Sequence, residues 1–376
     1  MKDISRINNP YDDDKLTACC SIFGMMSVER RTFSGSDIMT AIASMHDRGN
    51  GLGGGFAVYG LYPEYADHYA MHIMFTHSAA RQQVEDFLSD GLVIAKSERV
   101  PTRSVQAVTD SPDIWRYFVS VKPSKSEAAG EDDYVVRQVM TINTTLDGAY
   151  VFSSGKNLGV FKGVGFPEDI GRFFCLDEYE GYLWTAHGRF PTNSQAWWGG
   201  AHPFSILDWT VVHNGEISSY GTNRRYLEMF GYTCTMHTDT EVIAYGVDLL
   251  VRRHSLPVEL LARVLSPPMW TVLSYMEPSE RELCQTLRQV YGSLLMNGPF
   301  TVIIAHQNEM IGLTDRVRLR PLVAGVKKDM LYLSSEESAI RLICPDLSES
   351  WSPMGGEAVI GRVGQPLVPT QSLAAA

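Results

Sequence analysis

The sequence predicts an α+β fold in which helices are layered on largely antiparallel β-sheets. Short apolar runs separated by glycine recur along most of the chain, and only a few segments have a helical pattern. These elements follow one another as a strand, a helix, two strands, a helix, many strands, two helices and many strands, an order typical of α+β proteins. The Asn214-Gly215 pair at the end of a strand-like run adds a strong hairpin signal.

The predicted elements are separated by turn residues. Residues 20–27 form an apolar run typical of a strand, and residues 34–49 have a Ser or Asp cap near their start and a glycine at their end, as helices do. Residues 53–63 and 69–77 are predicted as the strands of a hairpin, and the polar segment 121–133 as a surface loop. Further strands are predicted at 134–143, 148–155, 159–164, 182–190, 209–217, 300–307, 309–315, 321–329 and 330–337, and further helices at 77–92, 240–254 and 281–295.

Composition excludes several classes of protein. With 376 residues, 44% of them hydrophobic and 20% charged, the chain has the balance of a globular protein with ample material for a core. A net charge of −11 without a Lys/Arg-rich run argues against nucleic acid as the main partner. No run approaches the roughly 18 uninterrupted apolar residues of a membrane helix. Six scattered cysteines without a disulfide framework indicate a reducing, cytoplasmic setting.

The first residues differ from the rest of the chain. Residues 1–18 hold four Asp and an Asn-Asn-Pro triplet, and they lack the basic and apolar regions of a secretory signal. They are either a frayed terminus or a removable propeptide. Cys19 and Cys20 follow, and neighbouring cysteines suit neither a disulfide with each other nor a Cys-x-x-Cys site. Either one of them is a nucleophile or both are small apolar residues at the start of a strand.

Most of the candidate catalytic and ligand-binding side chains lie between residues 187 and 241. In the motif HGRFPTN, Arg189 follows a strand, with Thr192 and Asn193 close behind it. A guanidinium fork beside a hydroxyl and an amide suits a carboxylate. The alternative is a surface arginine followed by turn residues.

Two further motifs lie in the same region. In HNGEI an Asn-Gly pair ends a strand, and in HTDTEV either Thr238 or Asp239 is placed to cap a helix, with Glu241 near the capping-box position. Taken singly, these motifs fit a turn and a helix start. The four histidines of this region lack a recognisable ligand spacing, so the sequence predicts no metal site. They are His187, His202, His213 and His237.

Together, these motifs resemble those of class II (N-terminal nucleophile) glutamine amidotransferases. The segments CSIFG, RGNGLGGGFAVY, HGRFPTN, HNGEI and TDTEV occur in the order found in that family. The segments GAYVFSSGKNLGVFKGVG, WWGGAHPF, NGPFTVIIAH, LTDRVRLRPL and LSSEES are similar to the amidotransferase domain of glutamate synthase in its free-standing form. The resemblance runs from Cys20 to about Gly361. Ser21 stands where Gly is usual, and residues 95–140 match no known motif.

The resemblance implies a four-layer αββα sandwich of two antiparallel sheets, the N-terminal-nucleophile hydrolase fold. It also implies the organisation of the chain. Residues 1–19 would be a leader or propeptide, residues 20–361 the class II glutamine amidotransferase domain, and residues 362–376 a loose C-terminal tail.

The resemblance also implies the roles of individual residues. Cys20, once N-terminal, would attack the side-chain amide carbon of L-glutamine, and its own α-amine would act as general base because it titrates at about 7.7–8. The Asn214 side chain and the Gly215 backbone N–H would form the oxyanion hole. The implied substrate-binding residues are Arg189 with Thr192 and Asn193, for the α-carboxylate, and Asp239, for the α-ammonium.

The sequence places the ammonia acceptor on other chains. It has no phosphate-binding loop with Lys, no Ser-Gly-Gly-x-Asp ATP loop and no acidic phosphoribosyl-pyrophosphate motif. The resemblance implies a synthase subunit carrying flavin and iron–sulfur clusters, a small glycine-repeat subunit, and no cofactor on this chain. Two alternatives stay open: a glutaminase serving another acceptor, such as an N-methylglutamate-type synthase, and a non-catalytic regulatory or assembly subunit that retains its leader.

Overall fold

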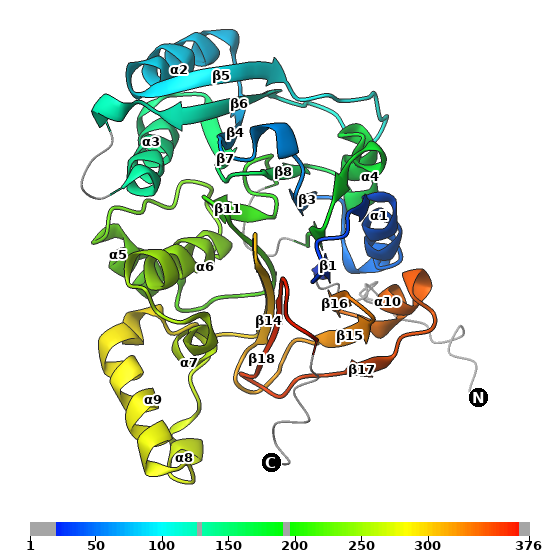
Figure 1. Ribbon diagram of the computed structural model, residues 1–376, viewed down its shortest axis with the longest axis vertical. Coiled ribbons are helices and arrows are strands. Elements are labelled where there is room, and N and C mark those ends of the chain that lie inside the picture. The colour runs from blue at the N-terminus through cyan, green and yellow to red at the C-terminus, as the bar shows by residue number, and fades with distance from the viewer. Residues whose placement is uncertain (1–19, 126–129, 191–195, 368–376) are drawn as a thin grey trace, which may run out of the picture.

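Two antiparallel sheets face each other at the centre of the computed structural model, which describes residues 20–125, 130–190 and 196–367 (Figure 1). The larger sheet has seven strands in the order β17-β15-β16-β1-β10-β3-β8, and the smaller has five in the order β11-β12-β13-β14-β18. The seven are Glu349–Trp351, Val323–Lys327, Met330–Ser334, Ser21–Ser27, Leu183–Gly188, Gly54–Tyr59 and Leu158–Gly163. The five are Phe204–Ile206, Trp209–Gly215, Phe300–His306, Glu309–Thr314 and Ala358–Arg362.

Helices cover the outer faces of both sheets. The seven-stranded sheet is covered by α1 (Ser36–Ala43), α4 (Pro167–Phe173) and α10 (Glu337–Ile343). On the five-stranded sheet, α6 (Thr240–Val247) packs against β11 and β12, and α5 (Tyr220–Glu228) packs beside it. The predicted four-layer αββα arrangement of helices and antiparallel sheets is therefore confirmed.

The interior between the sheets explains why β1 lacks the polar–apolar alternation of a half-exposed strand. All seven of its residues are buried, since neighbouring layers cover both of its faces. Phe23 of β1 lies in one apolar cluster with Val212 of β12 and Ile303 of β13. Burial of such large side chains contributes roughly 1.5–3 kcal/mol each to folding. The first strand after Cys20 is thus held rigidly in the core.

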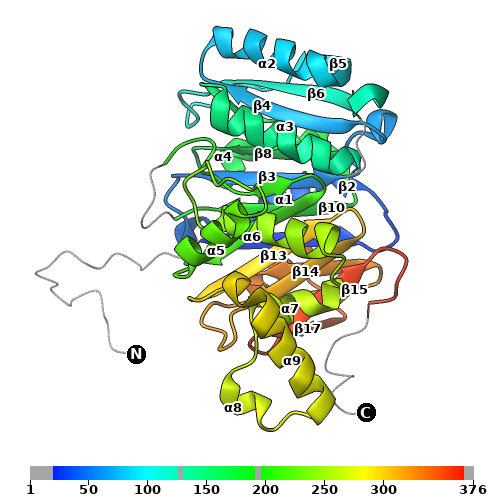
Figure 2. The same ribbon diagram turned by 90° about the vertical axis from the view of Figure 1, so that its left-hand side faces the viewer.

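A third, four-stranded sheet lies beyond the predicted sandwich, in the order β5-β6-β4-β7. Its strands are Leu92–Arg99, Asp113–Val121, Tyr69–Phe75 and Ala149–Ser153, and its helices are α2 (Ser78–Gly91) and α3 (Glu131–Thr145). Figure 2 shows this unit at the end of the molecule opposite α8 (Trp270–Leu273) and α9 (Pro278–Tyr291). The segment that matches no known motif therefore belongs to this added layer.

Two predicted elements are wrong in this region. The hairpin of residues 53–63 with 69–77 does not form, because β3 already pairs with β10 and β8, while β4 pairs with β6 and β7. Residues 134–143 are not a strand but the body of α3. Buried Val135, Val139 and Ile142 recur at helical spacing, and three acidic residues in the first turn suit the helix dipole.

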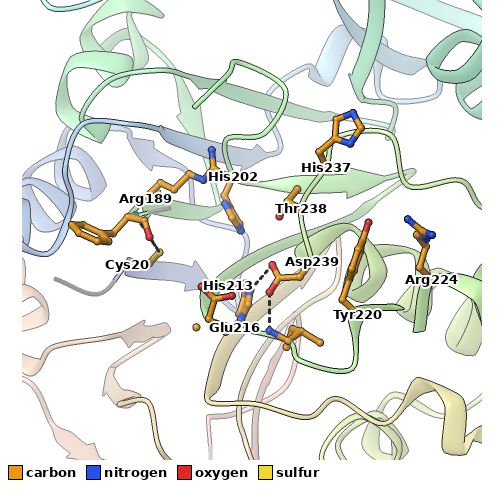
Figure 3. A pocket seen from close by; sticks show the side chains of 13 residues that line it. Cys20, Arg189, His202, His213, Glu216, Tyr220, Arg224, His237, Thr238 and Asp239 are labelled. Carbon is orange, nitrogen blue, oxygen red and sulfur yellow. Dashed lines mark hydrogen bonds and ion pairs between the residues drawn. The ribbon is translucent and has the colours of Figure 1, made fainter. Parts of the chain in front are cut away.

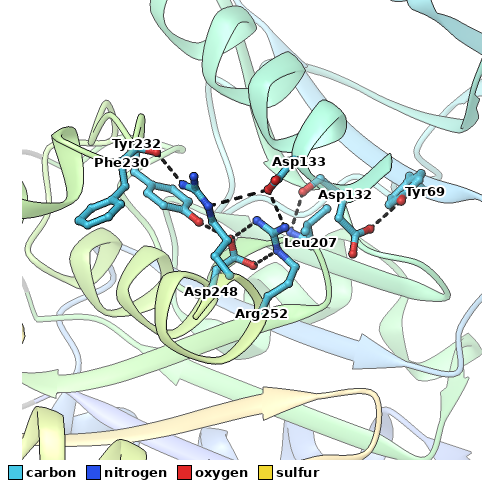
Figure 4. A network of polar contacts seen from close by, with 10 residues as sticks. Tyr69, Asp132, Asp133, Leu207, Phe230, Tyr232, Asp248 and Arg252 are labelled. Carbon is cyan, nitrogen blue, oxygen red and sulfur yellow. Dashed lines mark hydrogen bonds and ion pairs between the residues drawn. The ribbon is translucent and has the colours of Figure 1, made fainter. Parts of the chain in front are cut away.

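A network of charged side chains ties this layer to the sandwich (Figure 4). Arg252, in the π-helical turn Asp248–Arg253 that continues α6, donates to Asp248 and to Asp133 of α3, each at 2.7 Å. Asp248 is fully buried and also accepts from the Tyr232 hydroxyl at 2.5 Å. Burying this carboxylate is tolerated because several donors surround it.

The remaining elements are short. β2 (Phe33–Ser34) pairs with β9 (Glu180–Gly181), and α7 (Leu261–Leu265) precedes α8. Across residues 20–125, 130–190 and 196–367, no helix is both long and apolar enough to cross a membrane.

Candidate active site

A cavity of about 410 Å³ opens where β1, β10 and β12 come together with the start of α6. Its volume is in the range of small-molecule sites. Figure 3 shows Cys20 and Arg189 toward one end of the labelled side chains, Tyr220 and Arg224 toward the other, and Asp239 between them. The lining residues are Cys20, Arg189, Phe190, His202, His213, Gly215, Glu216, Ile217, Tyr220, Arg224, His237, Thr238 and Asp239.

Cys20 directly precedes β1, so its thiol sits at the edge of the buried sheet. Its sulfur accepts a hydrogen bond from the Phe190 backbone N–H at 3.3 Å. Burial raises the pKa of the Cys20 thiol to about 11, although the Phe190 N–H and the charge of Arg189 act in the opposite direction. At neutral pH the thiol is therefore protonated and requires a base before it can attack.

Arg189 follows the last residue of β10 and is only 3% exposed. Its backbone N–H donates to the Gly53 carbonyl at 2.8 Å, and a Cβ on Gly53 would come within 2.9 Å of the Arg189 side chain. The glycine-rich segment before β3 thus leaves room for the guanidinium. Burial lowers the pKa of Arg189, while Cys20 and Asp239 oppose this shift. The predicted partners Thr192 and Asn193 lie outside the described residues.

Asp239 is the residue immediately before α6, and its side chain is 22% exposed to the cavity. One carboxylate oxygen accepts from the Ile217 backbone N–H at 2.7 Å, and the other lies 3.7 Å from His213 Nδ1. Burial would raise the pKa of Asp239, but His213 and the Ile217 N–H outweigh it and hold the pKa below its usual value. Asp239 is therefore an anion at neutral pH and suits a cationic group.

Asn214 and Gly215 end β12. The hairpin that the Asn-Gly pair indicates does not form there, because β12 pairs with β11 and β13 and the chain continues into α5. Gly215 has φ +140°, and a Cβ there would lie 1.9 Å from the Pro299 carbonyl oxygen. Only glycine fits this position. Gly215 lines the cavity, whereas Asn214 does not line it and is fully buried beside it.

The histidines pack around the site, which the sequence did not predict. His187 and His202 stack with ring centroids 3.9 Å apart, and burial lowers the pKa of His187 to about 3. His202 and His213 each bond to the Thr240 hydroxyl, at 2.7 and 3.1 Å. The stacked rings of His187 and His202, whose pKa values are both lowered by burial, form a polar wall behind the cavity. Within the described ranges, no three His, Cys, Asp or Glu side chains are grouped to hold a metal ion.

The sequence also did not predict three further residues that line the cavity. They are Tyr220, Arg224 and His237. Tyr220 and Arg224 are four residues apart on α5, and the Arg224 guanidinium lies over the Tyr220 ring, 5.7 Å from its centroid. A spacing of four predicts that the two side chains are neighbours on a helix, but it does not predict which cavity they face.

The structure thus brings together four of the seven predicted site residues around one cavity: a thiol, a buried guanidinium, an ionised carboxylate and a glycine backbone. A guanidinium and a carboxylate that line the same cavity suit a zwitterionic ligand such as an α-amino acid. The thiol near the guanidinium is placed for nucleophilic chemistry on that ligand.

Comparison with known proteins agrees with this chemistry. A family model described as "Glutamine amidotransferases class-II" matches residues 59–233, which include Arg189, Asn214 and Gly215 but neither Cys20 nor Asp239. A protein of Methanothermobacter thermautotrophicus, provisionally named a glutamine amidotransferase, is 25% identical over 350 residues, 92% of this chain and 100% of that protein.

One further sequence relative and one solved structure were compared with the chain. An uncharacterized protein of Archaeoglobus fulgidus is 55% identical over 354 residues, covering 93% of this chain and 94% of that protein. The solved structure of glutamine phosphoribosylpyrophosphate amidotransferase from B. subtilis, complexed with ADP and GMP, is 15% identical with a TM-score of 0.45. That match covers 93% of this chain and 50% of the solved chain. Over residues 59–233, the chain is thus similar to the class II glutamine amidotransferases.

Proposed function

We propose that this chain is a glutaminase that hydrolyses L-glutamine to glutamate and ammonia through a thioester on Cys20, and that it delivers the ammonia to a partner synthase. The observation that best supports this function is that Cys20, Arg189 and Asp239 all line one cavity. Arg189 binds the α-carboxylate of glutamine and Asp239 binds its α-ammonium. A simple amide lacks both charges, so this pair selects glutamine over it.

The proposed chemistry proceeds in two steps. The Cys20 sulfur bonds to the amide carbon, the carbonyl electron pair moves onto oxygen, and the thiol proton passes to the α-amine of Cys20. The carbon–nitrogen bond then breaks, and the same proton leaves with the nitrogen as ammonia. Water attacks the thioester, again with the α-amine as base, and releases glutamate and the thiol.

The oxyanion of each step needs preorganised donors. The Asn214 side-chain amide and the Gly215 N–H, at the rigid end of β12, are the donors we assign to it. Loss of one such donor costs roughly 2.7–4 kcal/mol of transition-state stabilisation.

The base requires removal of the leader. A thiol with a pKa of about 11 is almost fully protonated at neutral pH, whereas an α-amine titrates at about 7.7–8. This amine exists only after cleavage of the Cys19–Cys20 peptide bond. We therefore assign residues 1–19 as a propeptide and Cys20 as the mature N-terminus.

The acceptor we propose is the synthase of a multi-chain glutamate synthase, in which a partner subunit holds flavin and iron–sulfur clusters. It would reduce a 2-iminoglutarate formed from ammonia and 2-oxoglutarate. The support is the similarity of the segments around residues 148–165 and 197–204, and of those after residue 297, to the free-standing glutamate synthase domain. A glutaminase that releases ammonia freely is wasteful, so the isolated chain should turn over slowly and the partner should raise its kcat.

Reconstitution tests this proposal. The mature chain is mixed with a flavin- and iron–sulfur-containing synthase subunit of the same genome, glutamine, isotopically labelled 2-oxoglutarate and an electron donor. Labelled glutamate, which can come only from the labelled 2-oxoglutarate, is measured. The expected result is labelled glutamate that requires both chains and is lost in Cys20→Ala.

Two other outcomes would change the proposed function. Ammonia release from glutamine without labelled glutamate would keep the glutaminase and replace the acceptor, for example by that of an N-methylglutamate-type synthase. An intact, inactive chain that still carries residues 1–19 inside an assembly would replace the glutaminase with a regulatory role.

A further inference from the structure

The LSSEES segment contains a buried serine that joins the two central sheets. Ser335 follows β16 and is 3% exposed. Its backbone N–H donates to the Ile22 carbonyl at 3.1 Å, and its hydroxyl oxygen accepts from the Ile22 N–H at 3.2 Å. Ser335 is therefore fixed to β1 two residues after the nucleophile.

The same hydroxyl reaches across to the other sheet. Ser335 Oγ lies 3.4 Å from the side-chain amide nitrogen of Asn214. Val212, two positions earlier on β12 and hence on the same face, packs in the cluster that contains Ile22. The Asn214 side chain thus projects from the five-stranded sheet toward β1, the strand that begins just after Cys20.

Hydrogen-bonding capacity decides how the Asn214 amide is oriented. As placed, the fully buried Asn214 Oδ1 has no hydrogen-bond partner among the described residues, which is costly for a buried polar atom. The nitrogen and oxygen of an amide have nearly the same shape, so their positions are assigned by hydrogen bonding. A hydroxyl offers one donor and two acceptor sites. Ser335 can therefore accept from Ile22 and donate to Asn214 Oδ1.

We propose that Ser335 is a positioning residue of the oxyanion site: its hydroxyl donates to Asn214 Oδ1 and so turns the Asn214 NH₂ group toward the reacting carbonyl. This inference rests on the proposed glutaminase function. Ser335 touches neither glutamine nor the thiol, and its effect passes through Asn214. Without the hydroxyl, the amide loses the contact that distinguishes its oxygen from its nitrogen.

A double-mutant cycle on the mature full-length chain tests the proposal. Ser335→Ala is expected to lower kcat for glutamine by about 10- to 100-fold while KM changes less than about twofold, since only the oxyanion is affected. Ser335→Thr, which keeps the hydroxyl, is expected to restore most of kcat. In an Asn214→Ala background, Ser335→Ala should have almost no further effect.

Ser334→Ala is the matched control. Ser334, the last residue of β16, is buried as well, but its hydroxyl contacts the Glu336 N–H and the Met45 sulfur instead of Asn214. Its kcat should stay near that of the wild type. If Ser335→Ala does not fold, Ser335→Cys keeps the side-chain shape with a weak donor and should show the same loss of kcat.

Two results would overturn the proposal: wild-type kcat in Ser335→Ala, or an equal loss of kcat from Ser335→Ala with and without Asn214. The same four proteins, unfolded in urea, give a readout independent of turnover, and non-additive unfolding free energies are expected from the hydroxyl–amide contact. Additive unfolding free energies would also overturn it. A wild-type chain without glutaminase activity but with this coupling would instead reject the proposed function and, with it, the catalytic role of Ser335.

Discussion

The sulfur of Cys20 lies 3.3 Å from the backbone nitrogen of Phe190, the residue that follows Arg189. The candidate nucleophile and the candidate carboxylate anchor are thus joined although 169 positions separate Cys20 from Arg189 in the chain, since 189 − 20 = 169. Cys20 and Arg189 lie close together because β1 and β10 are antiparallel neighbours, with Ser21 opposite Gly188. A shift of either strand by one residue would separate the two groups, so the sheet register controls the geometry of the site.

Replacing Arg189 by Lys should raise the KM for glutamine by about 10- to 100-fold, with a smaller change in kcat. An ammonium cannot reproduce the two parallel bonds of a guanidinium to a carboxylate, and charge-assisted hydrogen bonds contribute about 1.5–3 kcal/mol. Steady-state glutaminase kinetics measure this. Arg172→Lys, at a side chain 56% exposed on the surface, is the control and should behave as wild type. Normal KM in Arg189→Lys would remove Arg189 from the binding site.

Replacing Asp239 by Asn should also raise KM, because the neutral amide cannot pair with the α-ammonium of glutamine. The lowered pKa of Asp239 sets the pH dependence. In the wild type, binding should stay constant down through the usual carboxylate range near pH 4 and weaken only as pH falls through the lowered pKa. The contribution of this carboxylate to stability is likewise present above its unfolded pKa and lost below its folded pKa. A KM that rises between pH 7 and 5 in the wild type, but not in Asp239→Asn, would contradict this assignment.

Gly215→Ala should abolish glutaminase activity and destabilise the protein. The new Cβ would lie 1.9 Å from the Pro299 carbonyl oxygen, and φ is +140°, so the end of β12 must move. Thermal unfolding and kcat report the two effects. Gly292→Ala is the control, because its φ is −56° and no atom lies within 4 Å of the added Cβ. It should be neutral or stabilising by about 0.4–1 kcal/mol.

Arg252→Ala should reduce the free energy of unfolding by about 3–5 kcal/mol, because it leaves the buried Asp248 carboxylate without its cationic partner. Urea denaturation measures the loss. The control is Arg341→Ala, which breaks an exposed pair with Glu337 and should cost less than about 1 kcal/mol. Equal losses in the two variants would show that the network of Figure 4 does not hold α3 to the sandwich.

Local patterns predicted most strands of the two central sheets, because their apolar runs and glycine or Asn-Gly ends are local signals. The four-stranded sheet could not be predicted in this way, since β4 pairs with β6 and β7 across long stretches of sequence. The β-branched residues of segment 134–143 favour a strand, but the packing of one helical face against the core makes the segment a helix.

The residues of the candidate site also fall into two groups, those that local motifs predict and those that only long-range packing reveals. Arg189 and Asp239 stand in short motifs that the family resemblance singles out, so they were found from the sequence. His213 and Ser335 act through contacts with residues far away in the chain. No local pattern marks such contacts, and only the packed sheets bring them together.

Covalent labelling tests the central claim most directly. The protein is incubated with a glutamine analogue that carries an electrophilic diazoketone in place of the amide, and its intact mass is measured before peptide mapping. The account predicts a chain that begins at Cys20 and carries one adduct on Cys20, with labelling prevented by excess glutamine. An active chain that still contains Cys19, or an adduct on another residue, would contradict it.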